Sequence, residues 1–221
     1  MEELLRYLEQ FAPEGKIELF QEKIKDRTKH ITVVLEDIFQ PHNASAVLRS
    51  CDCFGVQDVH IIENRYKYQV NPDVALGSSK WLNLNKYNKA EQNTIACFNT
   101  LKEQGYKIIA TTPHKDDFSL YDIPVDEKLA IVFGTEKEGL SKTALAHADG
   151  FMRIPMYGFT ESFNISVSAA LSLYELTKRI RQDDSIKWQL NDSDKVETLL
   201  EWTKSAIKSA DLLIERFNKN T

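Results

Sequence analysis

The sequence predicts an α/β protein built on a mostly parallel sheet flanked by helices, with helical extensions at both ends. Short β-branched apolar runs, such as residues 31–35 and 129–133, alternate with longer segments of helical spacing. That alternation is typical of strand–helix–strand units, which form parallel sheets. The 221 residues and 42% hydrophobic content are enough for one substantial core of roughly 150 residues with terminal additions.

Composition excludes several classes of protein. The chain holds no run of about 18 apolar residues and no basic segment followed by an apolar one near Met1, so we expect neither a membrane span nor a secretory signal, and a cytoplasmic location. Cys51, Cys53 and Cys97 lack the spacing of a disulfide framework or a zinc site, and the five histidines are scattered. The sequence therefore predicts no metal site.

The formal net charge of −5 argues against binding nucleic acid by bulk electrostatics, because phosphate binding depends on Lys and Arg. Local clusters of basic residues can nevertheless bind phosphate despite the negative net charge. Basic residues gather at 16–30, 65–68 and 178–181, and the second of these segments mixes cations with aromatic rings. Such clusters are usually solvated faces, and RNA contact is the alternative.

The N-terminal half of the chain has clear helix and strand signals. Apolar spacing predicts two short helices over residues 4–11 and 17–24, within an N-terminal extension of residues 1–30. A strand over 31–35 follows. A helix over 44–54 comes next, with Asn43 as a favourable N-cap and Gly55 at the position of a left-handed C-terminal residue.

Similar signals predict the remaining strands and helices. They are strands over 59–62, 107–110, 129–133 and 151–154, and helices over 89–104, 141–148 and 164–181, with Ser141 as a cap. A polar linker then leads to apolar residues at helical intervals over 194–217. We therefore expect a central domain of residues 31–182 and a C-terminal helical extension of 183–221.

Three loops leave the carboxyl ends of predicted strands: residues 111–114, 134–139 and 156–163. Ligands bind at that edge of an open α/β sheet. If the three strands are neighbours, the loops form one pocket with apolar walls and glycines that permit close approach, which would suit a nucleoside-like ligand. The chain lacks the glycine patterns of a dinucleotide-binding or P-loop site.

Several polar residues near these loops have both a functional and a structural interpretation. Arg49 suits a phosphate, because its helix is otherwise mostly small and apolar, but an ion pair with Asp52 or Glu63 explains it equally well. Asn43 has helix capping as its alternative. For Glu136 the structural alternative is a solvated carboxylate in a turn. For Ser162 and Asn164 the structural alternative is helix capping.

Three ordered motifs join these residues. The first spans residues 41–55 and contains Asn43 and Arg49, the second spans 133–139 and contains Glu136, and the third spans 154–175 and contains Ser162 and Asn164. Together they resemble the SPOUT class of methyltransferases, and most closely its TrmH family of RNA ribose 2′-O-methyltransferases. The resemblance covers about residues 31–181.

The resemblance implies an α/β fold with a C-terminal trefoil knot, an S-adenosylmethionine cofactor and a homodimer. It also implies methylation of a ribose in tRNA, since the chain is most similar to members that act on guanosine 18 of the D-loop. The alternatives are another RNA such as ribosomal RNA, and a non-catalytic RNA-binding relative. By motif position, the cofactor would contact Thr111, Gly134, Ile154, Met156 and Phe163.

The same motifs assign catalytic and substrate-binding positions to Asn43, Arg49, Glu136, Ser162 and Asn164. Methyl transfer to a ribose oxygen needs in-line alignment and removal of the hydroxyl proton. A guanidinium with a pKa above about 12 is poorly suited to be a resting base. We therefore expect Arg49 to hold the phosphate beside the target ribose and to stabilise the forming alkoxide.

Overall fold

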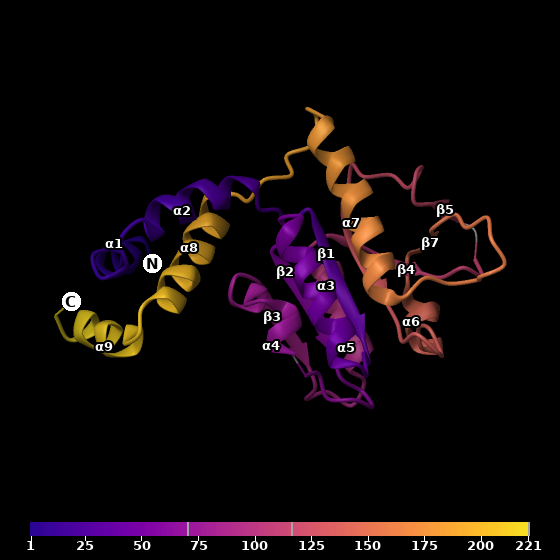
Figure 1. Ribbon diagram of the computed structural model, residues 1–221, viewed down its shortest axis with the longest axis horizontal. Helices are drawn as coiled ribbons and strands as arrows, with labels where there is room; N and C mark the ends of the chain where they lie inside the picture. The colour runs from indigo at the N-terminus through magenta and orange to yellow at the C-terminus, as the bar shows by residue number, and fades with distance from the viewer. Residues whose placement is uncertain (70, 116, 221) are drawn as a thin grey trace. The chain divides into compact units, whose positions relative to one another are not determined.

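The structure is a computed structural model that describes residues 1–69, 71–115 and 117–220. Internal contacts divide the chain into two compact units. The larger is Lys29–Trp188, and the smaller combines Met1–Thr28 with the segment that starts at Gln189. Figure 1 shows the elements of each unit.

The larger unit is built on a seven-stranded sheet within the described ranges, and every strand pairing there is parallel. Its order is β3-β2-β1-β6-β4-β7-β5. The strands are β1 (Ile31–Glu36), β2 (Asp58–Ile62), β3 (Asn83–Tyr87), β4 (Tyr106–Thr111), β5 (Phe118–Ser119), β6 (Lys128–Phe133) and β7 (Gly150–Arg153). The predicted α/β class with a mostly parallel sheet is confirmed, and all five predicted strands are present.

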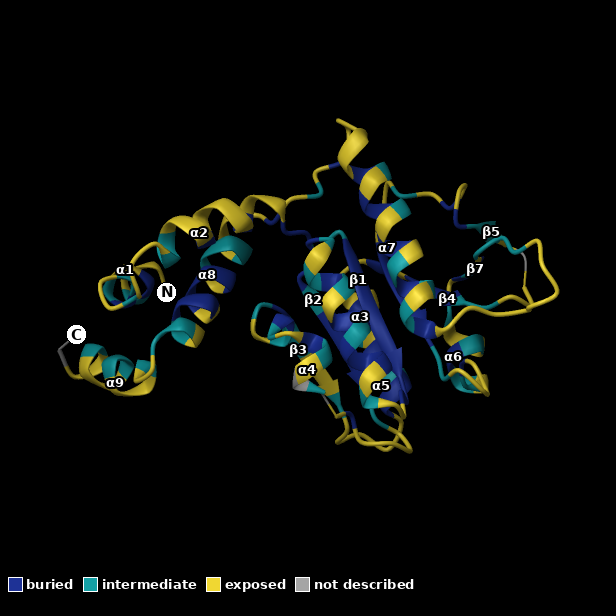
Figure 2. Cartoon of the chain, in the orientation of Figure 1, coloured by how far each residue is buried: buried dark blue, intermediate teal, exposed yellow. Residues whose placement is uncertain are grey.

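Helices cover both faces of this sheet. On one face α3 (Pro41–Cys53) and α7 (Ile165–Gln182) pack against each other and against Val33 and Leu35. On the other face α5 (Asn93–Glu103) and α6 (Lys142–His147) pack with Val34. Alternate residues of β1 thus point to opposite faces, as the pleat of a strand requires. Figure 2 shows the central strands buried between these layers.

Short elements complete this unit. They are α4 (Pro72–Ala75) and a 3-10 helix, η2 (Ser78–Lys80). The edge strand β3 was not predicted, because Asn83, Asn85 and Lys86 give it a polar sequence. It is held to its neighbour by the parallel ladder and by the amide of Gln57, which donates to the Trp81 carbonyl at 3.0 Å.

The start of α3 differs from the prediction. Asn43 was expected to be the N-cap, but the helix begins at Pro41 and its N-cap is Gln40. Proline is favoured in the first turn, where its fixed φ suits a helix and its missing N–H has no intrahelical partner. The side chain of Asn43 is therefore not used to cap α3, and the capping interpretation of this residue is wrong. Gly55 has a φ of 75°, which confirms its predicted place after the helix.

The smaller unit is a set of helices from the two ends of the chain. They are α1 (Glu2–Glu9), α2 (Lys16–Lys23), η1 (Ile24–Asp26), α8 (Asp192–Ala206) and α9 (Ala210–Asn220). Phe20 and Trp202 lie with ring centroids 5.6 Å apart, and Tyr7 and Phe217 lie 5.2 Å apart, so α1 and α2 pack on α8 and α9. The C-terminal extension is helical as predicted and consists of two helices, because the backbone at Ile207 is extended.

The described residues contain neither a membrane-spanning helix nor a cluster of metal ligands. No helix there has both the length and the apolar character that a bilayer crossing requires. Those same residues contain no group of three or more His, Cys, Asp or Glu placed to hold a metal ion. Cys51 and Cys97 are buried free thiols, and Cys53 is exposed.

Candidate active site

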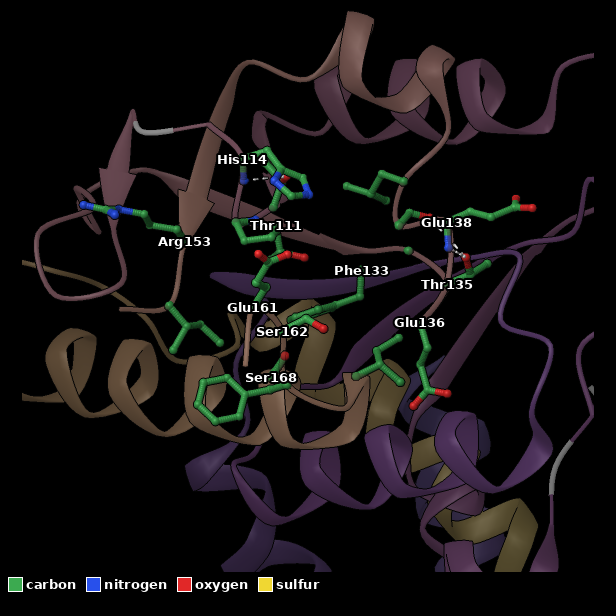
Figure 3. Close-up of a pocket in the computed structure, with 18 of the residues that line it drawn as sticks. Thr111, His114, Phe133, Thr135, Glu136, Glu138, Arg153, Glu161, Ser162 and Ser168 are labelled. Atoms are coloured by element: carbon green, nitrogen blue, oxygen red, sulfur yellow. Dashed lines mark hydrogen bonds between the residues drawn. The ribbon is translucent and has the colours of Figure 1, made fainter. Parts of the chain in front are cut away.

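The carboxyl ends of β6, β4 and β7 are adjacent, because these strands are consecutive in the sheet. The loops that follow them line a single cavity of about 310 Å³ (Figure 3). This confirms the expectation that the three loops form one pocket. The cavity is lined mainly by residues 111–114, 133–140, 152–154 and 161–163, with Met156, Ile165 and Ser168.

The loop after β6 is folded tightly on itself. The backbone N–H groups of Thr135 and Gly139 donate to each other's carbonyls at 2.9 and 3.0 Å, and Gly139 has a left-handed φ of 68°. A Cβ at Gly134 would overlap the backbone of Gly139 and Leu140. Glycine is therefore required at this point, and the loop brings its backbone to the cavity without a side chain in between.

Residues of the three motifs meet at one side of this loop. The side-chain amide nitrogen of Asn164 donates to Oε1 of Glu136, and it lies 3.3 Å from Oδ1 of Asn43. These contacts join α3, the loop after β6 and the start of α7. In Figure 3 the Glu136 carboxylate points away from Thr111 and His114.

Asn164 also caps α7. Its Oδ1 accepts from the backbone N–H of Ser166 at 2.8 Å, so the capping interpretation and the contact with Glu136 are both satisfied by one side chain. Ser162 does not cap this helix. Its side chain lines the cavity, as Figure 3 shows.

The predicted cofactor positions all line the 310 Å³ cavity: Thr111, Gly134, Ile154, Met156 and Phe163. Thr111 is fixed by its hydroxyl, which donates to the Val132 carbonyl on the neighbouring strand at 2.8 Å. The cavity also uses residues that the sequence did not single out, among them Met152 and Ser168. No local sequence pattern marks these two residues as cavity residues, because only the folded arrangement of β7 and α7 brings them to the cavity.

Arg49 lies apart from the other motif residues. It is exposed on α3 and does not line this cavity. Among the described residues it has no hydrogen-bond or ion-pair partner. Glu63, one proposed partner, accepts instead from the Tyr68 backbone N–H at 2.9 Å and the Asn88 amide at 2.7 Å. A structural ion pair with Asp52 or Glu63 is therefore absent within this chain's described residues.

A second cavity, of about 280 Å³, lies beside the first, between the segments that follow β1 and β6. The two cavities share one stretch of wall, which is residues 135–138 with Ile165. The rest of the second cavity is lined by Ile38, Phe39, Gln40, Asn43 and Tyr66. Of these, the sequence had marked Asn43 and the segment of residues 65–68.

Residues 30–174 match the SpoU rRNA Methylase family. This match covers well over half of the chain. The chain belongs to the SpoU rRNA Methylase family. The resemblance to TrmH enzymes that the three motifs indicated is confirmed by this membership and by the relatives described next.

Two SpoU relatives and one solved structure illustrate the similarity. A tRNA (guanosine(18)-2'-O)-methyltransferase of Borreliella burgdorferi is 41% identical over 96% of this chain and 94% of its own length. The enzyme of the same name from Thermus thermophilus is 34% identical over 75% of this chain and 84% of its own. The crystal structure of a TrmH/SpoU tRNA modifying enzyme from A. aeolicus is 26% identical, covers 86% of this chain and 95% of that one, and has a TM-score of 0.76.

Proposed function

We propose that this SpoU-family chain is a tRNA methyltransferase that transfers a methyl group from S-adenosylmethionine to the ribose 2′-oxygen of guanosine 18 in the D-loop. The observation that carries the proposal is the meeting of Asn43, Glu136 and Asn164, from three separate motifs, beside a cavity lined by the third motif's other residues. The 41% identity with the Borreliella burgdorferi enzyme over nearly the whole chain supports the choice of tRNA.

The residues of the 310 Å³ cavity fit S-adenosylmethionine. Its volume is at the lower end of the range of small-molecule pockets, which begins at roughly 300 Å³. Apolar side chains from Ile154, Met156 and Phe163 suit an adenine ring, and the bare backbone at Gly134 permits close approach. When bound, this cofactor supplies an electrophilic methyl group on a sulfonium.

The chain's own residues would position the acceptor. The amides of Asn43 and Asn164 and the Glu136 carboxylate form one hydrogen-bonded group whose polar atoms can hold a ribose hydroxyl, with Ser162 at the cavity wall. Positioning of two reactants in a favourable geometry accounts for much of the rate of such transfers. Arg49 would bind the adjacent phosphate through its forked donors and stabilise the negative charge that forms on the oxygen.

A homodimer is part of this proposal. On α7, Val167, Leu171 and Tyr174 are 43%, 39% and 56% exposed, and their spacing places them on one side of the helix. Such an apolar face is typical of an interface. A site shared by two copies would also give a role to Arg49, which stands outside both cavities of its own chain.

Three further expectations belong to the same proposal. Residues 31–182 would form the methyltransferase domain, flanked by the extensions 1–30 and 183–221. The C-terminal part of that domain would be threaded into a trefoil knot, a rare departure from the rule that chains avoid knots. The enzyme would act in the cytoplasm with its tRNA substrate.

The test is transfer of a radiolabelled methyl group to unmodified tRNA and, in parallel, to ribosomal RNA, with the modified position mapped by nuclease digestion. We expect label at guanosine 18 of tRNA. Label on ribosomal RNA instead would show that the substrate is ribosomal RNA and not tRNA. Failure to label any RNA would contradict an enzymatic function.

A further inference from the structure

The second cavity carries a pair of aromatic rings at its surface. Phe39 is 67% exposed and Tyr66 is 39% exposed, although both side chains are large and at least partly apolar. Their ring centroids are 4.9 Å apart with an interplanar angle of 63°, an edge-to-face arrangement. Two aromatic rings from segments far apart in the sequence therefore form one accessible wall of this cavity.

The wall is held in place by the buried Asp37. This residue has a left-handed φ of 53° and is 3% exposed. Its Oδ1 accepts from the backbone N–H groups of Asn64 and Arg65 at 2.7 and 2.8 Å, which fixes the segment that carries Tyr66. The turn at Asp37 also begins the segment that carries Phe39. Asp37 thus connects the segment that carries Tyr66 to the turn that leads to Phe39.

A second link joins this wall to the loop between the cavities. The Arg65 guanidinium lies 2.7 Å from the Glu138 carboxylate and 3.6 Å from that of Asp37. Proximity to Glu138 raises the pKa of Arg65 above its ordinary value. The Arg65–Glu138 ion pair therefore connects the segment that carries Tyr66 to the loop of residues 134–139, which also lines the first cavity.

We propose that Phe39 and Tyr66 hold the nucleobase of the nucleotide that is methylated. The inference rests on the proposed function, in which the first cavity holds the methyl donor. The acceptor ribose would then lie beside Asn164 at Glu136, which belongs to the wall that the two cavities share, and the base attached to that ribose would extend into the second cavity. Proteins read bases that are splayed out of RNA loops by stacking them on aromatic side chains.

The polar atoms around the second cavity suit a guanine. The carboxylates of Glu136 and Glu138 accept hydrogen bonds, as the amino group of guanine requires, and the ammonium of Lys137 donates, as its ring acceptors require. Phe39 itself carries no polar atom, so its contribution is confined to ring contact. A substitution of Phe39 therefore measures the aromatic contribution without removing a hydrogen bond.

The experiment pairs a change in the protein with a change in the RNA. Phe39→Ala and Phe39→Trp would be assayed on full-length unmodified tRNA, and on the same tRNA in which the acceptor nucleotide keeps its ribose but lacks its base. Tyr121→Ala is the matched control, because Tyr121 is 61% exposed and lines neither cavity. Both kcat/KM for methyl transfer and the equilibrium Kd for each tRNA would be measured.

On intact tRNA we expect Phe39→Ala to lower kcat/KM by roughly 10- to 100-fold, as stacking on one aromatic residue contributes, and Phe39→Trp to retain most of it. On the abasic tRNA, Phe39→Ala and wild type should perform alike, and Tyr121→Ala should match wild type on both RNAs. The inference would be overturned if Phe39→Ala lowered kcat/KM equally on tRNA with and without the base, or did not lower it on intact tRNA.

Failure of the inference and failure of the proposed function give different results. If wild type transfers methyl groups to tRNA but the Phe39 variants show no dependence on the base, the function stands and the base site is wrong. If wild type transfers no methyl group, the Kd values for the two tRNAs show whether the aromatic site binds the base. Base-dependent weakening of tRNA binding by Phe39→Ala would support the aromatic site, and equal binding would reject it.

Discussion

The side-chain amide of Asn164 donates a hydrogen bond to the carboxylate of Glu136, while the oxygen of the same side chain caps α7. One residue thus links the start of α7 to the loop that separates the two cavities. Its two roles use opposite ends of the amide, the nitrogen as donor and the oxygen as acceptor. A substitution that alters one end alone can separate them.

Asn164→Asp is that substitution. Aspartate caps helices as well as asparagine does, so we expect the free energy of unfolding to change by less than about 1 kcal/mol. Aspartate cannot donate to Glu136 and places a like charge beside it, so methyl transfer should fall by roughly 10-fold or more. Denaturant unfolding and methylation kinetics would measure the two effects. Asn164→Ala, which removes both ends, is the comparison, and full activity of Asn164→Asp would contradict the proposed role.

Arg49→Lys tests the phosphate contact. Because Arg49 is exposed and has no partner among the described residues, the stability of the variant should stay within about 0.5 kcal/mol of wild type. Lysine keeps the charge but loses the two-pronged geometry, so we expect kcat/KM to fall by roughly 10- to 100-fold. Arg216→Lys, at an exposed position of α9, is the control. Wild-type rate and tRNA affinity in Arg49→Lys would rule out the two-pronged contact.

Local signals predicted most of the larger unit. The buried runs of β1, β4 and β6 are apolar and β-branched enough to be recognised, and Ser141 caps α6 as expected, with its Oγ accepting from Ala144 at 3.0 Å. The polar edge strand β3 was missed because its stability comes from its neighbour in the sheet. The capping interpretation of Asn43 was wrong because Pro41, two residues earlier, begins the helix.

The arrangement of the site depends on contacts that no local pattern contains. The sequence marked the three loops, but it is the consecutive order of β6, β4 and β7 in the sheet that joins them, and the place of β6 beside β1 that adds the second cavity. Phe39 and Tyr66 are far apart in the chain, and their contact follows from the turn at Asp37. Functional motifs could be read from the sequence, whereas the aromatic wall required the fold.

Gly134→Ala should disrupt the 310 Å³ cavity proposed to bind S-adenosylmethionine. The added Cβ would overlap the backbone of Gly139 and Leu140, so the loop must shift, with a loss of roughly 1–3 kcal/mol in stability. We expect weaker binding of S-adenosylmethionine, measured by titration calorimetry. Gly158→Ala is the control, since a Cβ there meets no atom within 4 Å. Unchanged cofactor affinity in Gly134→Ala would place the cofactor elsewhere.

Leu171→Glu tests the proposed homodimer. Leu171 is 39% exposed on the apolar side of α7, so a charge there should leave the monomer folded but should be unfavourable in a buried interface. We expect light scattering to show a dimer for wild type and a monomer for the variant, with circular dichroism unchanged. Leu212→Glu, at a 67% exposed leucine of α9, is the control. A monomeric wild type would contradict the proposal directly.

His60 should make stability depend on pH. It is 2% exposed on β2, its Nδ1 lies 3.1 Å from the Tyr87 hydroxyl, and burial lowers its pKa from 6.5 to about 4. Because the unfolded chain binds the proton more readily, this contribution to stability is complete above about pH 6.5 and is lost as the pH falls towards 4. The difference corresponds to at most about 3 kcal/mol. Denaturant unfolding at pH 7.5 and 5 should therefore show a smaller decline for His60→Leu than for wild type, and equal declines would show that His60 does not titrate on unfolding.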